Sequence, residues 1–197
     1  MPLYEVNEDE ERFSLFNNYI QLNGKHGFFK IGDETIFMNS SQEKFNGRYD
    51  TAEKNIGLLT VHFSDAQVEV FPSSDASLHW TCSIGIRTDE SLVDDKNAKQ
   101  LIINLQKSPF SQCRLEVPLH LQIAITGVNL NGKFHQMNYP LDINAQIGKI
   151  SLQVKPELNY NFDIYPLSVQ NGNFLSSKAA NAYPIKIQLI DGEVKSL

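Results

Sequence analysis

The sequence predicts an all-β protein, an antiparallel β-sandwich or flattened barrel of about 8–10 short strands with long surface loops. Three observations lead to this fold class. Apolar and polar side chains alternate with period two in most apolar segments, which is typical of strands with one face in water. Asn-Gly and Asp-Gly pairs, which suit tight turns, recur along the chain. Helical periodicity is weak, so we expect at most one or two short helices.

The expected strands share this alternation and cover residues 59–63, 80–86, 115–125, 141–147, 150–154 and 185–189. The cleanest run contains Pro118, which cannot donate a ladder hydrogen bond. We expect Pro118 at an edge, at a bulge, or between two strands that change sheet. The apolar parity reverses at Gly148, which predicts a bulge or a bend at that residue.

The segments between these strands are expected to be turns and loops. Asn131–Gly132 is the strongest hairpin candidate, because it follows a long alternating segment and precedes another. Residues 43–56 are polar and unpatterned, and residues 89–99 are expected to form a loop or a short helix. Residues 167–182 are expected to form a long surface loop. No internal repeat with a fixed period of 20–50 residues is visible.

The predicted organisation is an acidic segment at residues 1–12 followed by one β-sandwich domain at residues 13–197. No linker rich in Pro, Gly or Ser divides the chain. The 197 residues carry 17 basic and 23 acidic side chains, a net charge of −6. This acidic balance makes nucleic acid an unexpected partner. The acidic runs within residues 5–11 and 89–95 are expected to be solvated.

No run approaches the roughly 18 apolar residues that a membrane helix needs, so membrane insertion is not expected. The first 13 residues lack the basic and then apolar pattern of a signal peptide. If Met1 is the native start, the chain is expected in the cytoplasm. Otherwise it is an exported chain from which a signal has been removed.

Cys82 and Cys113 each lie on the apolar parity of an expected strand. The favoured interpretation is two free, buried thiols that act as small hydrophobic side chains. The alternative is a disulfide between neighbouring or facing strands, as in exported sandwich domains. A catalytic thiolate needs an exposed polar setting, and the expected burial argues against that role.

Three histidines, His62, His79 and His120, lie on the polar parity of expected strands, with Glu116 nearby in sequence. If these strands were neighbours, three imidazoles and one carboxylate could hold zinc or iron on the outer face of a sheet. Close spacings such as HxH and HExxH are absent, so separate surface histidines are the competing interpretation. No cofactor is expected.

Residues 159–166 interleave aromatic and amide side chains. Tyr160, Phe162 and Tyr165, with Asn171 and Asn173 from the following loop, form a candidate ligand-binding site. Aromatic faces and amides can bind carbohydrate through stacking and hydrogen bonds, or form hot spots for a protein partner. The alternative is an ordinary strand that turns Tyr160 and Phe162 into the core.

Motifs for nucleophilic or phosphate chemistry, such as GxSxG, GxxxxGK and GxGxxG, are absent. The sequence therefore favours a non-catalytic interaction or assembly protein that acts through protein–protein contacts, self-assembly included. A carbohydrate-binding, lectin-like module that uses residues 159–166 is the alternative. A metal-dependent enzyme that uses the strand histidines is a second alternative.

Overall fold

The computed structural model gives the backbone of five strands within residues 1–42, and it describes residues 43–85, 91–108, 110–172 and 174–197 with their side chains. Contacts divide the chain into two units, Met1–Glu43 and Lys44–Leu197. This division differs from the expected boundary after residue 12, because residues 4–7 and 12–15 pair with one another. The acidic side chains of residues 1–12 lie outside the described residues.

The first unit is a five-stranded antiparallel sheet. Its strands are β1 (Tyr4–Asn7), β2 (Arg12–Leu15), β3 (Asn18–Asn23), β4 (Phe28–Ile31) and β5 (Glu34–Phe37). Each strand pairs with the next one in the chain. Short connections of this kind are sufficient for antiparallel pairing.

The second unit is one mixed sheet of 11 strands, which confirms the all-β class. The strands are β6 (Glu43–Asp50), β7 (Leu58–Pro72), β8 (Ser77–Ile84), β9 (Leu92–Asp95), β10 (Gln100–Leu105), β11 (Ser111–Val117), β12 (Gln122–Met137), β13 (Leu141–Val154), β14 (Tyr160–Tyr165), β15 (Gln170–Asn171) and β16 (Tyr183–Ser196). A short 3-10 helix, η2 (Leu167–Val169), lies between β14 and β15. Strands β6 and β9 occupy segments that the sequence left without a strand.

The long strands pair in parallel, which corrects the antiparallel arrangement expected from the sequence. β7, β12, β13 and β16 lie in that spatial order, and each pairing keeps its register along most of the strand. The expectation rested on the rule that strands with one wet face are antiparallel. These parallel strands also have one face in the core and one in water, so they show the same alternation.

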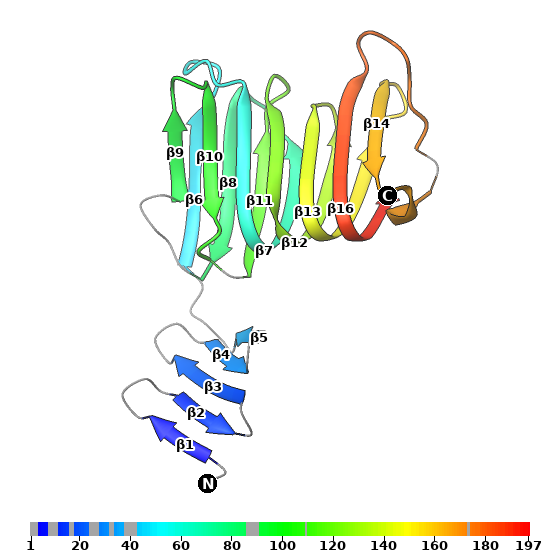
Figure 1. Ribbon diagram of the computed structural model, residues 1–197. Coiled ribbons are helices and arrows are strands. Elements are labelled where there is room, and N and C mark those ends of the chain that lie inside the picture. The colour runs from blue at the N-terminus through cyan, green and yellow to red at the C-terminus, as the bar shows by residue number, and fades with distance from the viewer. Residues whose placement is uncertain are drawn as a thin grey trace. The chain divides into compact units, whose positions relative to one another are not determined.

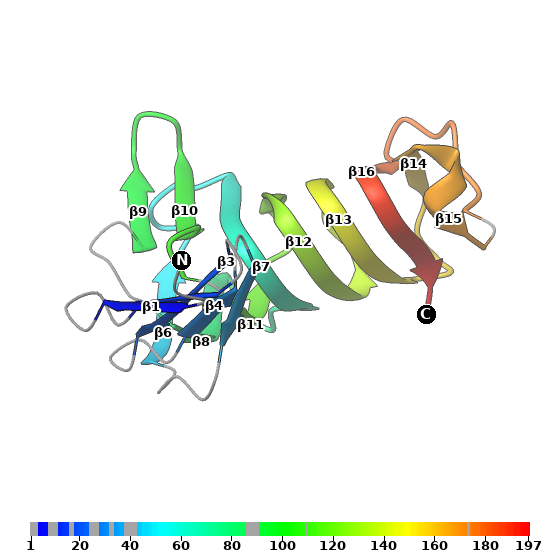
Figure 2. The ribbon, with the colours of Figure 1, turned by 60° about the horizontal axis from the view of Figure 1, so that its bottom comes forward.

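Each long strand bends back on itself and so provides the return path that parallel pairing requires. We call each bent long strand, or the short strands that replace it, one rung of the stack. Ile123 pairs with Leu141, so neighbouring rungs are 141 − 123 = 18 residues apart in the chain. Only residues 138–140 separate β12 from β13. Three residues reach about 10 Å, whereas the 16 residues of β12 would span about 53 Å if they ran straight. The strand must therefore curve, and Figure 2 shows β12, β13 and β16 as neighbouring arcs.

Every rung has a first side, a corner and a second side. In β12 the buried residues fall on one parity up to Ile125 and on the other parity from Leu130 to Phe134, with Val128 and Asn129 exposed at the corner. β13 and β16 have corners at residues 146–147 and 190–191. The parity reversal predicted at Gly148 is thereby confirmed as a bend. Buried side chains from both sides form one core cluster, so the same strands build both layers.

The outermost rungs each consist of two short strands. β10 and β11 pair in parallel with the first and second halves of β7, and β14 and β15 pair in the same way with β16. β16 therefore lies between β13 and β14, although it follows both in the chain (Figure 1). Beyond β10 and β11, the antiparallel strands β9 and β8 extend the sheet, and β6 forms the edge beside β8.

The turn predictions had mixed outcomes. Pro118 lies between two strands, as expected, because β11 ends at Val117 and β12 begins at Gln122. The hairpin at Asn131–Gly132 is wrong, since both residues lie inside β12 and pair with β7 and β13. An Asn-Gly pair indicates a hairpin only where the chain reverses, and here it continues along the second side.

Gly192 lies just after the corner of β16, where the backbone requires glycine. Its φ is +132°, a conformation that L side chains rarely adopt. Gly192 pairs with Gly148 on the neighbouring rung, and a Cβ at Gly192 would overlap the Gly148 carbonyl oxygen. The close approach of the two backbones at this level therefore depends on glycine.

Candidate functional site

Two adjoining hollows on the outer surface of the second side form a groove that crosses the strands. Their volumes are about 310 and 410 Å³, and Gln67, Gln112 and Asn131 line both of them. Ser83 lines the smaller hollow. We call this surface the amide groove and define it by its central row, Ser83, Gln112, Gln67 and Asn131.

The central row follows from strand register. Ser83 pairs with Gln112, Gln112 with Gln67, and Gln67 with Asn131. Adjacent strands lie about 4.8 Å apart, so four uncharged hydrogen-bonding side chains stand side by side across β8, β11, β7 and β12. Their neighbours along the strands, such as Val68, are buried in the core. The row therefore faces outward.

Next to the central row, the groove has a charged row whose members are paired. Lys133 Nζ donates to Glu69 Oε1 over 3.2 Å. Arg114 donates from two nitrogens to Glu116 Oε1, each over 3.2 Å, and its guanidinium lies 4.1 Å from the centroid of the Phe71 ring. Exposed ion pairs add little stability. Their consequence here is that positive and negative charges are balanced beside the amides.

Phe110 lines the larger hollow in a strained backbone conformation. Its φ is +53°, its side chain is 47% exposed, and Ile147 lines the same hollow from β13. A bulky residue in the left-handed region is an outlier. Strain of this kind is concentrated at functional positions.

The aromatic segment proposed from the sequence is only partly exposed. Tyr160 is buried, and its hydroxyl donates to the Met137 carbonyl over 2.6 Å and accepts from the Lys155 amide over 2.9 Å. Burial is the main reason why the pKa of Tyr160 is raised. Phe162 is half-buried against Phe174, with ring centroids 5.2 Å apart. Tyr160 therefore has a structural contact in the core.

Two other members of that candidate site, Tyr165 and Asn171, have separate surroundings. Tyr165 is exposed, and Asn171 donates from Nδ2 to Glu193 Oε1 over 2.6 Å. Asn173 lies outside the described residues. The loop after β15 covers part of the β14 edge, because the Ser177 amide donates to the Tyr160 carbonyl over 2.7 Å.

The candidate metal ligands lie on different parts of the second unit. His79 pairs with Glu116 across β8 and β11, whereas His62 lies on the first side of β7, between Asn104 and Thr126. His120 follows β11, and its Nε2 lies 3.1 Å from the hydroxyl of Thr51. Within the described ranges, no group of three or more His, Cys, Asp or Glu side chains is placed to hold a metal ion.

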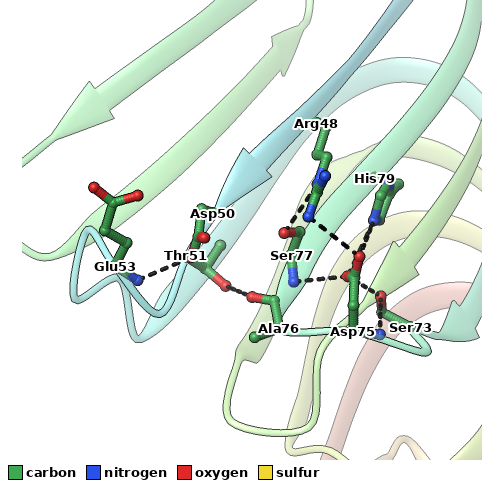
Figure 3. Close-up of polar contacts among 9 residues, drawn as sticks. All are labelled: Arg48, Asp50, Thr51, Glu53, Ser73, Asp75, Ala76, Ser77 and His79. Atoms are coloured by element: carbon green, nitrogen blue, oxygen red, sulfur yellow. Dashed lines mark hydrogen bonds and ion pairs between the residues drawn. The ribbon is translucent and has the colours of Figure 1, made fainter.

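His79 instead belongs to a polar cluster around Asp75, in the turn between β7 and β8 (Figure 3). The carboxylate accepts from the Ser77 amide over 2.8 Å, from Ser73 Oγ over 3.0 Å, and lies 3.1 Å from His79 Nε2. The Ser77 amide, followed by His79, lowers the pKa of Asp75 to about 2. Ser73 and His79 bond the same carboxylate and so do not form the serine–histidine contact of a hydrolytic triad. The cluster stabilises the turn.

The acidic run near residue 95 also has local partners. Tyr49 donates its hydroxyl hydrogen bond to Asp94, and burial together with this contact raises the pKa of Tyr49 to about 12. Asp95 accepts from the amides of Asn97 and Ala98, both over 3.1 Å. Asp95 therefore holds the turn between β9 and β10, whereas Asp94 contacts Tyr49 of β6.

Cys82 and Cys113 form a disulfide, so the favoured interpretation of two free thiols is wrong. The two residues are direct partners on the antiparallel strands β8 and β11. Both are buried. The apolar parity of each cysteine was predicted correctly, but the register that brings them together depends on long-range pairing.

A row of exposed apolar side chains follows the corners of successive rungs, and we call it the corner ridge. Its members are Val128 of β12, Ile147 of β13, Ile190 of β16, and Tyr165 and Leu167 of the outermost rung. Leu167 and Ile190 are 76% and 78% exposed. Neighbouring corners are one strand spacing apart, so these side chains lie along one edge of the stack. Polar residues lie among them, because Ile147 is in register with Asn129 and Asp191.

The amide groove and the corner ridge are features that the sequence did not reveal. Alternation places Gln67, Gln112 and Asn131 on outward faces, which was the available signal. The order β11–β7–β12 that brings them together is not sequential in the chain. The corner ridge likewise requires knowing that the parity reversals of different strands are aligned.

These features define an all-β protein whose second unit is a stack of bent, parallel rungs. Its fold is similar to that of a crystal structure described as a "putative cell adhesion protein" from Clostridium sporogenes ATCC 15579. The TM-score is 0.52 and the sequence identity 8%, with 79% of this chain and 99% of that chain covered. No protein-family model matches the sequence, and no curated protein matches it. The described ranges contain no helix with the length and apolar character needed to cross a bilayer.

Proposed function

We propose that this chain is a non-catalytic interaction protein that binds a protein partner, or a second copy of itself, through the corner ridge. The observation that carries the proposal is that exposed apolar side chains recur on consecutive corners. Single exposed apolar residues are common on protein surfaces, but several of them gathered along one edge indicate a contact surface.

The geometry of the ridge supports this role. Stacked rungs hold Val128, Ile147 and Ile190 on neighbouring strands, so the ridge is preorganised before a partner arrives. Ordering flexible side chains and loops opposes binding, and a rigid surface reduces that loss. Tyrosine is among the typical anchors of interfaces, and the exposed Tyr165 belongs to the ridge.

Two further observations agree with an interaction role. The structural neighbour is described as a putative cell adhesion protein. The buried Cys82–Cys113 bridge is of a kind that persists in oxidising compartments, where surface and exported proteins work. Both support contacts made outside a reducing cytoplasm.

The test places a photo-crosslinking amino acid at Ile190 in the full chain, produced in its own cells. The control position is Leu119, which is also exposed and apolar but lies in the turn after β11. We expect a discrete crosslinked protein from position 190 and none from position 119. The substitution Ile147→Arg should abolish that product. Equal labelling from both positions, or persistence in the Ile147→Arg variant, would contradict the proposal.

A further inference from the structure

We propose that the amide groove binds an uncharged carbohydrate chain laid across the strands of the second side. This site is separate in chemistry from the apolar corner ridge, although Ile147 contributes to both surfaces. The inference concerns a second ligand and does not require the protein contact proposed above.

The central row provides the hydrogen bonds that a carbohydrate needs. Side-chain amides both donate and accept, and the Ser83 hydroxyl does the same. Sugar hydroxyls have this same dual character. Gln112, Gln67 and Asn131 stand in register on consecutive strands, so one extended ligand can contact all of them.

The direction and spacing of the row favour a glycan over a peptide. The row advances by one strand spacing, about 4.8 Å, whereas a peptide strand rises about 3.4 Å per residue. A pyranose unit of an extended glycan advances by about one strand spacing. In addition, peptides that add to sheets bind at an edge and use backbone groups, while the groove lies on a face, where the β7 backbone is already paired on both sides.

The charges beside the row favour an uncharged ligand. The larger hollow also has one carboxylate and one ammonium in its lining, Asp65 and Lys149, and their charges cancel. Lys133 is neutralised by Glu69, and Arg114 by Glu116. A phosphate or carboxylate ligand would have to compete with these intramolecular pairs. A neutral hydroxylated ligand can use the amides without separating them.

Phe110 gives the groove an aromatic surface at one end. Its ring lines the larger hollow together with Gln112 and Asn131, and the apolar face of a sugar packs well on an aromatic side chain.

The experiment screens the intact protein on an array of neutral and acidic glycans and then measures the affinity of a soluble oligosaccharide hit by calorimetry. The variants Gln67→Ala and Asn131→Ala each remove one hydrogen-bonding group of the row. Each is expected to weaken binding about tenfold. Phe110→Asn removes the ring with a residue that tolerates positive φ, and it should weaken binding by a similar factor.

The matched control is Asn144→Ala, an exposed amide on β13 that lines neither hollow, and it should bind as the unmodified protein does. Thermal melting of every variant checks that the fold is retained. A silent array, a preference for acidic glycans only, or equal losses in the control and groove variants would overturn the proposal. Crosslinking from position 190 is scored separately, so failure of this inference leaves the ridge proposal standing. Loss of that crosslink in Gln67→Ala would assign the groove to the protein partner instead.

Discussion

We expect removal of the Cys82–Cys113 disulfide to lower the free energy of unfolding of the second unit by about 3.7 kcal/mol. The bridge joins residues 31 positions apart. Closing a loop of that length removes about 12 cal/mol/K of entropy from the unfolded chain, which gives about 3.7 kcal/mol at 25 °C. The bridge connects β8 to β11. Without it, no covalent cross-link joins the described strands at the antiparallel end of the sheet.

The assay is urea unfolding with and without reductant, followed by the fluorescence of the single tryptophan. Trp80 is buried and lies two residues before Cys82 on β8, so its emission reports on this end of the sheet. With a denaturant slope of about 2 kcal/mol per molar, the midpoint should fall by about 2 M when the bridge is reduced. Mass spectrometry establishes the redox state of each sample.

The double variant Cys82→Ala/Cys113→Ala serves as the control, because reductant should not change its midpoint. An unchanged midpoint in the natural chain, with the bridge shown to be intact before reduction and broken after it, would refute the reasoning. A reduction-sensitive midpoint in the double variant would show that the reductant acts elsewhere.

Four further predictions concern single residues of the second unit. Gly192→Ala should destabilise by about 2 kcal/mol or more in urea unfolding, because positive φ and overlap with Gly148 act together; a cost under about 0.5 kcal/mol would contradict the close approach. Tyr160→Phe should cost about 1–3 kcal/mol, since its buried hydroxyl makes two hydrogen bonds. Tyr139→Phe should be neutral or stabilising, because within the described ranges its buried hydroxyl has no partner; a larger loss at Tyr139 than at Tyr160 would reverse the argument. The pKa of Asp75 is lowered to about 2, so its contribution to stability is complete above about pH 4 and is lost as pH falls toward 2; Asp75→Asn should flatten acid unfolding in that window, and an unchanged acid profile would count against the turn cluster.

Much of the local structure could be predicted because alternation reports directly on burial. The inward faces around Val61, Leu115 and Ile143 were identified correctly, as were the bend at Gly148 and the break at Pro118. Each of these depends only on neighbours in the chain. Local patterns therefore determine which side of a strand is wet.

The pairing of the strands could not be predicted in the same way. One-sided parallel strands and antiparallel strands give the same alternation, so nothing near Ile123 or Leu141 distinguishes the two. The sequence separation between paired residues of neighbouring rungs also varies, since Leu58 pairs with Gln122 and Leu141 pairs with Ile185. A search for a fixed period therefore finds no repeat, although neighbouring rungs are alike in space.

The candidate sites depended on the same missing information. His62 and His79 lie on different strands and His120 lies in the turn after β11, so the fold does not bring the three together. Gln67 and Gln112 lie far apart in the chain and become neighbours only through the pairing of β7 with β11. The candidate surfaces of this sheet run across the strands, whereas sequence patterns run along them.

The position of β16 between β13 and β14 has a consequence for synthesis. β14 and β15 leave the ribosome before the strand with which they pair, so Tyr160 and Ile164 at first have no neighbouring rung. The arrival of residues 183–196 then completes two ladders at once, one with β13 and one with β14. A nascent chain stopped before residue 183 should therefore lack two ordered rungs rather than one, and a chaperone that binds exposed apolar strands would find its target in residues 160–171.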